Sequence, residues 1–236
     1  MPNYLMPHPR RLLNVYLRQW RFLSRLLFGV TIPWNLRGHG DNPSRVVPRI
    51  HWDFTTIMLK RCLVELVKPW HEVLEIGTGP YAILSISLAK RVRCRITACD
   101  VNEQHLRDAR RVVVANNVMV KLLQSDLFHA VEGQFDFIFF NAVYIPRDVG
   151  RKLGIDGFHE RETDWCGGEA GTEVIERFLR DAPAHLKDGG RVLLGFNPRY
   201  LPEHCLTELR EGCGYNLIGR YTMLFNPSVV HALRRR

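Results

Sequence analysis

Paired cysteines and long hydrophobic runs are both missing from this sequence. The six cysteines form no CxxC pair and lack the dense spacing of a disulfide framework, so we expect reduced, mostly buried thiols. No histidine and cysteine cluster has zinc-ligand spacing, so no metal is expected. Arginines interrupt the apolar stretches of the first 50 residues, which argues against a membrane-spanning helix. No small-residue cleavage site follows a continuous apolar core, which argues against a secretory signal.

Acidic residues are scarce near the amino terminus. Residues 1–50 hold eight arginines and a single acid, Asp41, and so carry most of the formal net charge of +9. The three arginines at 234–236 add to it, and the remaining chain is nearly neutral. A basic arm on a neutral body indicates contact with an anionic membrane surface, nucleic acid or an acidic partner. An organellar transit peptide also has few acids, but it is rich in serine, which is scarce here.

Residues 11–28 predict a basic amphipathic helix. Leu13, Trp20 and Leu27 are spaced seven apart, and three arginines with the same spacing lie on a different side. Three interpretations fit this helix: packing on the domain or in a homodimer, docking at an anionic membrane, or contact with nucleic acid. We expect a basic arm over residues 1–45, a single domain over residues 46–236, and a cytoplasmic protein that could attach peripherally to a membrane.

From residue 53 onward, predicted helices and strands alternate. Asp53 is expected to cap a helix over 53–68. Strands are predicted at 71–76, 95–101, 120–125, 135–140, 191–196, 215–224 and 229–234, and further helices at 81–92, 103–116, 172–186 and 202–212, with a long loop after residue 140. This alternation predicts an α/β fold with a mainly parallel sheet covered on both faces.

Glycines and acids follow successive predicted strands. Gly77 and Gly79 permit a tight turn and close approach of the backbone to a ligand. Asp100 ends the next strand, where a carboxylate can accept both hydroxyls of a ribose, and Asp126 follows the third strand, within reach of an adenine amino group. Ligands of open parallel sheets bind at the carboxyl ends of the strands. An adenosine-containing cofactor is therefore expected.

Two cofactors compete for such a site. A nicotinamide dinucleotide is disfavoured by Glu75, because a carboxylate is unfavourable beside a pyrophosphate, and by Ala82, where the third glycine of GxGxxG would fall. S-adenosylmethionine has an ammonium, a sulfonium and a ribose but no phosphate, so it fits better.

A polar segment, Asn-Ala-Val-Tyr-Ile-Pro at 141–146, follows the apolar strand at 135–140. Together with Glu75-Ile-Gly-Thr-Gly79, Asp100 and Ser125-Asp-Leu-Phe128, it resembles the class I S-adenosylmethionine-dependent methyltransferases, and among them the release-factor glutamine methyltransferases, whose motif reads NPPYIP. The resemblance covers roughly residues 45–200, including Val47-Pro48-Arg49 and the glycine-rich run 167–171. It implies a Rossmann-like class I fold with a seven-stranded sheet, preceded here by the amphipathic helix.

The resemblance also implies roles for individual residues. Asn141 would orient the acceptor nitrogen along the line of methyl transfer, which lowers the barrier by positioning, and Tyr144 would form the wall of the acceptor pocket. The residues implied for cofactor binding are Glu75, Gly77, Thr78, Gly79, Tyr81, Asp100, Val101, Asp126, Leu127 and Asn141. The implied activity is N-methylation of an amide or amine of a peptide, protein or small metabolite.

Departures from the family pattern keep alternatives open. Ala142 and Val143 replace two prolines, which removes about 0.4–1 kcal/mol of stiffening each, and Tyr81 stands where the family has its third glycine. The family's separate substrate-recognising helical domain has no counterpart in residues 1–45. The alternatives are a nucleic-acid methyltransferase of the adenine N6 type and a cofactor-binding accessory protein without activity. Trp165 and Cys166 are expected to line the acceptor pocket or to anchor a loop, and the candidate bases are His51 and His159.

Overall fold

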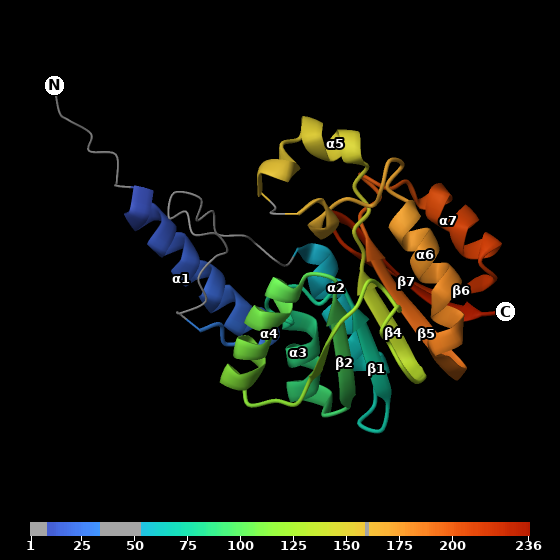
Figure 1. The fold of residues 1–236 in the computed structure, drawn as a ribbon, viewed down its shortest axis with the longest axis horizontal. Helices are drawn as coiled ribbons and strands as arrows, with labels where there is room; N and C mark the ends of the chain where they lie inside the picture. The colour runs from blue at the N-terminus through green and yellow to red at the C-terminus, as the bar shows by residue number, and fades with distance from the viewer. Residues whose placement is uncertain (1–8, 34–52, 159–160) are drawn as a thin grey trace.

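The computed structural model describes residues 9–33, 53–158 and 161–236 (Figure 1). In this part of the chain, one sheet has the strand order β3-β2-β1-β4-β5-β7-β6. The strands are β1 Glu72–Ile76, β2 Arg95–Asp100, β3 Lys121–Gln124, β4 Phe135–Asn141, β5 Leu186–Phe196, β6 Tyr215–Met223 and β7 Asn226–Arg235. The first five are parallel, and β7 is antiparallel to both of its neighbours. The predicted mainly parallel, seven-stranded Rossmann-like sheet is confirmed.

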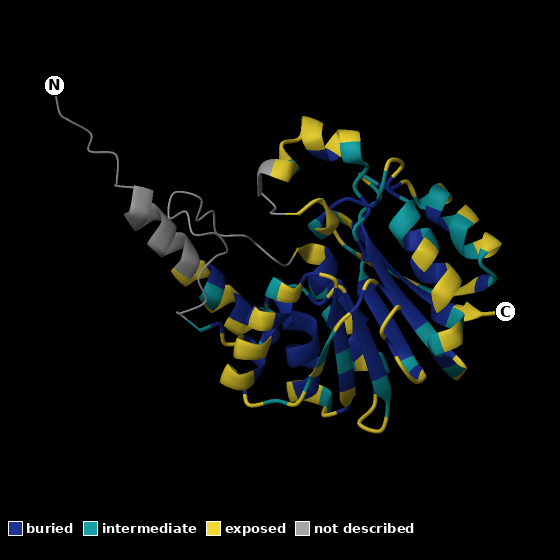
Figure 2. Cartoon of the chain, in the orientation of Figure 1, coloured by how far each residue is buried: buried dark blue, intermediate teal, exposed yellow. Residues whose placement is uncertain are grey.

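Helices pack on both faces of this sheet. They are α1 Pro9–Phe28, α2 Phe54–Leu66, α3 Ile83–Val92, α4 Glu103–Ala115, α5 Arg147–Lys152, α6 Glu173–Asp181 and α7 Glu203–Gly212. Side chains from α1 to α4 join the apolar core on one face, whereas α6 and α7 contribute to the core on the other. The central strands are almost wholly buried between these layers, and the outer sides of the helices are exposed (Figure 2).

The chain reverses its direction of winding between β1 and β4. β2 and β3 lie on one side of β1, and β4 with the later strands lies on the other. The loops that leave the carboxyl ends of β1, β2, β3 and β4 therefore open at one edge of the sheet, on either side of the reversal. This is the position at which open α/β sheets bind their ligands.

α2 begins as its sequence predicts. Asp53 is the N-cap, and its Oδ1 accepts a hydrogen bond from the Thr56 amide at 2.9 Å, while the Asp53 amide donates to Thr56 Oγ1 at 3.1 Å. This reciprocal capping box satisfies two backbone donors that the first helical turn would otherwise leave unpaired. It also fixes the position of the Thr56 hydroxyl, which contacts the site described below.

Three predicted boundaries after β4 are wrong, among them the start of β7, which lies at Asn226 rather than at 229. The helix predicted to reach residue 186 ends at Asp181, and Ala182–His185 form a 3₁₀ turn, because Pro183 has no amide hydrogen to continue the α-helix. β5 begins at Leu186 rather than 191, since Leu186 already pairs with Phe135. The predicted long loop contains α5 and two 3₁₀ turns, Ile155–Phe158 and Glu162–Asp164, which are too short for an apolar periodicity to reveal.

The second half of α1 packs on the domain. Trp20 and Phe28 are buried, whereas Arg18 and Arg25 are exposed, as the spacing of apolar and basic residues predicts. Phe22 and Leu26 remain 65% and 63% exposed. Packing on the domain, the first interpretation of this helix, therefore accounts for one side of it and leaves a second apolar stripe in solvent.

Lysines of two other helices hold the end of α1. Lys60 Nζ of α2 donates to the Leu27 carbonyl at 2.6 Å, and Lys90 Nζ of α3 donates to the Gly29 carbonyl at 2.7 Å. Cations at these positions satisfy terminal carbonyls and interact favourably with the negative end of the helix dipole. This end of α1 is therefore tied to the same helices that flank β1.

Four of the six cysteines are buried, which confirms the prediction of mostly buried cysteines. Burial raises the pKa of Cys62 to about 11 and that of Cys99 to about 12. Among the described residues, no helix is both long enough and apolar enough to span a bilayer. Two predicted features, Val47-Pro48-Arg49 and the candidate base His51, lie outside the described residues.

Candidate active site

The loop after β1 makes two turns that favour glycine. Gly77 and Gly79 have φ values of +68° and +64°, in the left-handed region that other residues rarely adopt. A Cβ on Gly77 would stand 3.1 Å from the Phe140 ring, whereas Gly79 has no atom within 4 Å of such a Cβ. The Gly79 amide donates to Asp100 Oδ2 at 2.8 Å. The loop thus exposes its backbone to open space and is tied to the end of β2.

Glu75 supports this loop from behind. Thr78 Oγ1 donates to Glu75 Oε2 at 2.8 Å, and Ser85 Oγ donates to the same oxygen. The Glu75 side chain is buried, and burial raises its pKa to about 7 despite these hydrogen bonds. Glu75 was predicted to face the cofactor, but it is not among the residues that line the pocket. Its carboxylate shapes the glycine loop instead.

Asp100 lies where the ribose-binding acid was predicted. Its Oδ1 accepts from the Asn102 amide at 2.8 Å, and Asn102 in turn caps α4 by accepting from the Gln104 amide. Val101 is 39% exposed beside it, and both residues line the pocket. The cap fixes the backbone immediately after β2, so the Asp100 carboxylate is held at the rim.

Asp126 and Leu127 form the rim after β3. Asp126 Oδ2 is 2.8 Å from Arg177 Nη2 of α6, and both side chains are half exposed. Leu127 is buried with a φ of +47°, and its carbonyl accepts from Cys99 Sγ at 3.6 Å. Both residues line the pocket as predicted, with the aspartate tied to the helix on the other face of the sheet.

Asn141 and Tyr144 occupy the end of β4. Asn141 Nδ2 donates to Thr56 Oγ1 at 3.2 Å, and that hydroxyl donates to Asp53 Oδ1 at 2.9 Å. The Asn141 amide is therefore oriented by the capping box of α2. Tyr144 is buried, and its pKa is raised, first by burial and then by the nearby Asp53 carboxylate. Its hydroxyl therefore stays protonated at neutral pH.

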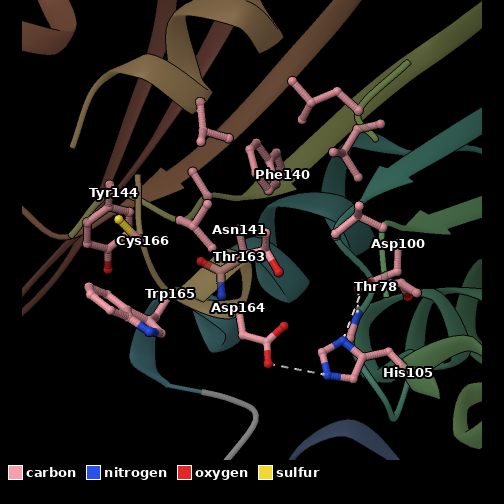
Figure 3. A pocket seen from close by; sticks show the side chains of 18 of the residues that line it. Thr78, Asp100, His105, Phe140, Asn141, Tyr144, Thr163, Asp164, Trp165 and Cys166 are labelled. Atoms are coloured by element: carbon pink, nitrogen blue, oxygen red, sulfur yellow. Dashed lines mark hydrogen bonds and ion pairs between the residues drawn. The ribbon is translucent and has the colours of Figure 1, made fainter. Parts of the chain in front are cut away.

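The loop ends enclose a single cavity of about 540 Å³, within the range of small-molecule sites. It brings together all of the predicted site residues except Glu75 and Tyr81 (Figure 3). Its acidic lining residues are Asp53, Asp100, Asp126 and Asp164, and the arginine that lines it, Arg177, is paired with Asp126. An acidic cavity beside an open glycine loop suits a cationic nucleoside that carries no phosphate, so these residues fit S-adenosylmethionine.

Tyr81 turns away from the cavity. Its ring centroid lies 4.8 Å from that of Trp20 on α1, with the planes tilted by 51°. The side chain that replaces the family's third glycine therefore leaves the cofactor space open and packs on the amino-terminal helix. The implied role of Tyr81 in cofactor binding has no support from this position.

Two residues that line the cavity, His105 and Asp164, were not predicted from the sequence. His105 Nδ1 lies 3.3 Å from Asp100 Oδ1, and its Nε2 lies 3.8 Å from Asp164 Oδ2, with all three side chains buried (Figure 3). His105 is on the first turn of α4 and Asp164 is more than 50 residues later in the chain. His105 could have been predicted, because it lies only a few positions after Asp100 in the chain. No local sequence pattern identifies Asp164 as a residue of the cavity.

A glycine-rich run braces the loop that carries Tyr144. The Gly167 amide donates to the Ile145 carbonyl at 3.0 Å, and the Arg147 amide donates to the Gly168 carbonyl at 3.0 Å. A Cβ on Gly167 would lie 2.7 Å from Tyr144 Cα, and one on Gly171 would lie 2.5 Å from the Tyr144 carbonyl oxygen. Side chains cannot fit between these two segments, which explains the glycines.

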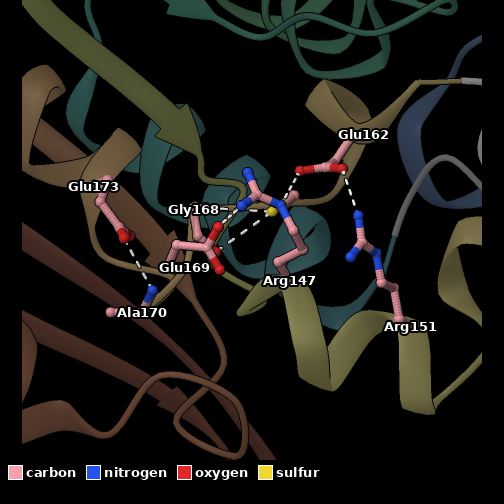
Figure 4. Close-up of polar contacts among 8 residues, drawn as sticks. Arg147, Arg151, Glu162, Gly168, Glu169, Ala170 and Glu173 are labelled. Carbon is pink, nitrogen blue, oxygen red and sulfur yellow. Dashed lines mark hydrogen bonds and ion pairs between the residues drawn. The ribbon is translucent and has the colours of Figure 1, made fainter.

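Charged residues fasten the same two segments from outside. Arg147 forms ion pairs with Glu162 and Glu169, and Arg151 Nη2 lies 3.5 Å from Glu162 Oε2 (Figure 4). Trp165 is buried against α5, where a Cβ on Gly150 would stand 2.0 Å from its ring. Trp165 and Cys166 also line the cavity, so both interpretations of this pair hold. His159 lies outside the described residues.

The fold, with an adenosine-type site at the point where its sheet reverses, is that of the class I methyltransferases. Residues 44–144 match the methyltransferase small domain family. Among solved structures, a methyltransferase from Pyrococcus furiosus superposes with a TM-score of 0.62 at 23% identity over 95% of this chain and 96% of that one. The ribosomal protein L11 methylase of Lactobacillus delbrueckii subsp. bulgaricus gives 0.59 at 18% identity, over 78% and 80%.

Curated relatives point to one branch of this class. A putative protein N5-glutamine methyltransferase of Methanocaldococcus jannaschii is 36% identical over 58% of this chain and 66% of its own length. The release factor glutamine methyltransferase of Streptococcus pneumoniae is 31% identical over 69% of this chain and 62% of its own. Over residues 44–144 the chain matches a methyltransferase domain, and it is similar to the glutamine-methylating branch of the class I S-adenosylmethionine-dependent methyltransferases, as the motifs predicted. It spans less than two thirds of the length of these curated relatives.

Proposed function

We propose that this chain transfers the methyl group of S-adenosylmethionine to an amide nitrogen of a peptide or protein. The observation that carries the proposal is the placement of Asn141 in the same cavity as Gly79 and Asp100. The relatives are named for glutamine methylation of proteins, so a glutamine side chain is the first acceptor to test. Amines and small metabolites are the wider set of acceptors that the motif allows.

The cofactor supplies an electrophilic methyl group on a positively charged sulfur. We assign its binding to the residues that line the cavity after β1, β2 and β3, namely Gly77, Thr78, Gly79, Asp100, Val101, Asp126 and Leu127. Asp100 offers a fixed carboxylate for hydroxyl donors, and the glycine loop offers backbone without side-chain obstruction. Asp164 and Asp53 add negative charge that favours a cation.

Asn141 orients the acceptor. Because its Nδ2 donates to Thr56, the carbonyl oxygen of the same side chain is the atom free to accept from the acceptor N–H. A held N–H fixes the direction of the nitrogen lone pair, and positioning of this kind can lower a barrier by several kcal/mol, of the order of 7–11 kcal/mol in the best cases. Tyr144 is buried next to it and forms the wall of the acceptor space.

Two measurements test this function. Calorimetric titration should show S-adenosylmethionine binding to the wild type, and Asp100→Ala should weaken it by about 10-fold to 100-fold, since a hydrogen bond to a charged group contributes about 1.5–3 kcal/mol. Radiolabelled methyl groups should then enter the protein fraction of a lysate. No binding by the wild type, or unchanged affinity in Asp100→Ala, would refute the cofactor assignment.

The alternatives make different predictions. The relatives are named for protein substrates, so a nucleic-acid acceptor is not favoured. Radiolabel in the nucleic-acid fraction would instead support a nucleic-acid methyltransferase. Cofactor binding without label in any fraction would indicate an accessory protein. The chain boundary between a basic arm (1–45) and a domain (46–236) remains our proposal, as does a homodimer.

We further propose that the exposed side of α1 contacts an anionic membrane surface. Phe22 and Leu26 are more than 60% exposed, with Arg18 and Arg25 exposed on the same helix, and this combination suits the lipid interface. Sedimentation with vesicles containing anionic lipid should retain the wild type and release a Phe22→Ser, Leu26→Ser variant. Equal retention of both would refute the membrane contact and leave an acidic partner as the alternative.

A further inference from the structure

The hairpin of β6 and β7 reaches the same edge of the sheet as the cavity. Across the sheet, Asn141 pairs with Gly195, Gly195 with Val230 and Val230 with Tyr221. Neighbouring strands are about 4.8 Å apart, so this row spans roughly 14 Å. β6 runs in the same direction as β4. The last residues of β6 and the turn that follows therefore lie past this row of paired residues, towards the carboxyl ends of the parallel strands, where the cavity is.

The tip of this hairpin is apolar and exposed. Leu224 is 80% exposed and Phe225 is 98% exposed. The neighbouring Met223 is partly buried against the apolar core that α2 and β7 share, and α2 contacts both β6 and β7, so the hairpin and α2 lie on the same face of the sheet. Phe54, the first residue of α2, is 52% exposed, and the residue before it lines the cavity. Exposed apolar side chains therefore stand both on α2, next to a residue of the cavity, and on a hairpin that reaches the same edge of the sheet.

Phe225 adopts an unfavourable backbone conformation to reach this position. Its φ is +60°, in the left-handed region where a bulky residue is rare and where glycine is the usual choice. Exposure of 98% means that folding does not bury this ring. Neither hydrophobic burial nor turn geometry explains a phenylalanine here, and with Leu224 beside it the ring forms part of an exposed apolar pair that is available to a partner.

Charge distinguishes the kinds of partner. Residues 221–230, from Tyr221 to Val230, contain no charged side chain. A nucleic acid would need lysine or arginine near its phosphates, and the tip offers none. Apolar and aromatic side chains without charge are instead typical of the centre of protein interfaces.

We propose that the hairpin tip, Met223–Asn226, together with Phe54 forms a docking surface for the polypeptide that flanks the methylated side chain of a protein acceptor. The inference rests on the proposed function and adds to it where the acceptor lies. Asn141 and Tyr144 accommodate one side chain inside the cavity, so the flanking chain of the acceptor must cross the rim. The docking surface binds that chain and raises the affinity for acceptor without contacting the cofactor.

Two variants test this surface. Phe225→Gly removes the ring. Glycine adopts a φ of +60° without strain, so the free energy of unfolding should stay the same or rise. Leu224→Ser removes the second apolar side chain. Met119→Ser is the matched control, because Met119 is 89% exposed and precedes β3, at the opposite edge of the sheet.

The probes are labelled S-adenosylmethionine and the protein fraction of a lysate at a series of dilutions. At low acceptor concentration, we expect each hairpin variant to incorporate about tenfold less label than the wild type, which is the size of effect that loss of an interface hot spot produces. At high acceptor concentration, label incorporation by the variants should approach that of the wild type. Cofactor affinity by calorimetry and the melting temperature should match the wild type, and Met119→Ser should label normally.

The failures are distinguishable. If wild type labels protein and both hairpin variants label it equally at every dilution, the docking surface is refuted and the proposed function stands. If wild type binds no cofactor or labels no protein, the proposed function is refuted on the wild type alone, and the docking surface with it. Label in nucleic acid that is insensitive to Phe225→Gly would also refute a polypeptide at this rim.

Discussion

The two sides of the cavity are built in different ways. On the side that we assign to the cofactor, each loop follows its own strand, and the amides of Gly79 and Asn102 both donate to Asp100. On the side that we assign to the acceptor, Asn141 is oriented by Thr56, a residue 85 positions earlier in the chain. Short sequence motifs therefore build most of the first side, where Asp126 is also held by Arg177, 51 positions later, whereas the second depends on the packing of distant segments.

Removal of the Asn141 side chain should separate the two sides most clearly. Asn141→Ala is expected to lower turnover about 10²-fold to 10³-fold, because the acceptor nitrogen loses its positioning partner. Cofactor affinity should stay within about twofold, as the cofactor-side loops keep their own hydrogen bonds. Initial rates at saturating cofactor, with calorimetry in parallel, measure both. A parallel loss of affinity would mean that the two sides are one unit.

The buried Glu75 should make the cofactor side sensitive to pH. Its pKa is raised by burial to about 7, above the unfolded value near 4.5, so its contribution to stability is complete below pH 4.5 and is lost as pH rises through 7. The loss amounts to at most about 3 kcal/mol. Denaturant unfolding at pH 5 and pH 8 should show this difference in wild type and a smaller one in Glu75→Gln. Equal pH dependence of the two proteins would contradict it.

The close contact of two backbones should make the acceptor side sensitive to a single methyl group. Gly167→Ala is expected to destabilise the protein by about 1–3 kcal/mol, because its Cβ would meet the backbone of Tyr144 and Gly171. Turnover should fall more than cofactor affinity. Gly212→Ala is the control, since its Cβ meets nothing within 4 Å and should be neutral in denaturant unfolding. A neutral Gly167→Ala would show that the brace is adaptable.

The smallest effect should come from the contact between α1 and the cofactor loop. A double-mutant cycle of Trp20→Leu and Tyr81→Leu is expected to give a coupling energy of about 1 kcal/mol, the usual size for an aromatic pair. Cofactor affinity should fall in Trp20→Leu by a few fold at most. A cycle with no coupling would mean that α1 packs on the domain independently of the glycine loop.

Sequence reasoning found residues that line the cavity where chemistry and chain position coincide. Gly77, Asp100 and Asp126 were placed at the site because each follows a recognisable strand, and parallel strands end at one edge. Glu75 and Tyr81 occupy motif positions too, yet one supports the loop from behind and the other packs on α1. A motif specifies where the backbone goes but not which way every side chain turns.

The rest required the folded chain. Asp164 reaches His105 across the cavity, and the hairpin tip reaches the cavity's edge of the sheet only because β6 and β7 extend the sheet beyond β5. Neither has a periodic or compositional signal, since such contacts depend on loop paths and on the order of strands. The same holds for Thr56, whose capping role was predictable from Asp53 but whose contact with Asn141 was not.

By itself, the amino-acid sequence determined the class of fold, the strands and the loops that line the cavity after them, because apolar periodicity and turn chemistry act over a few residues. Only the tertiary structure decided how the end of β4 is assembled, with Asn141 held by α2 and the Tyr144 loop braced by glycines. The physical reason is that these contacts join residues far apart in the chain, and packing of the whole sheet and its helices sets which of them meet.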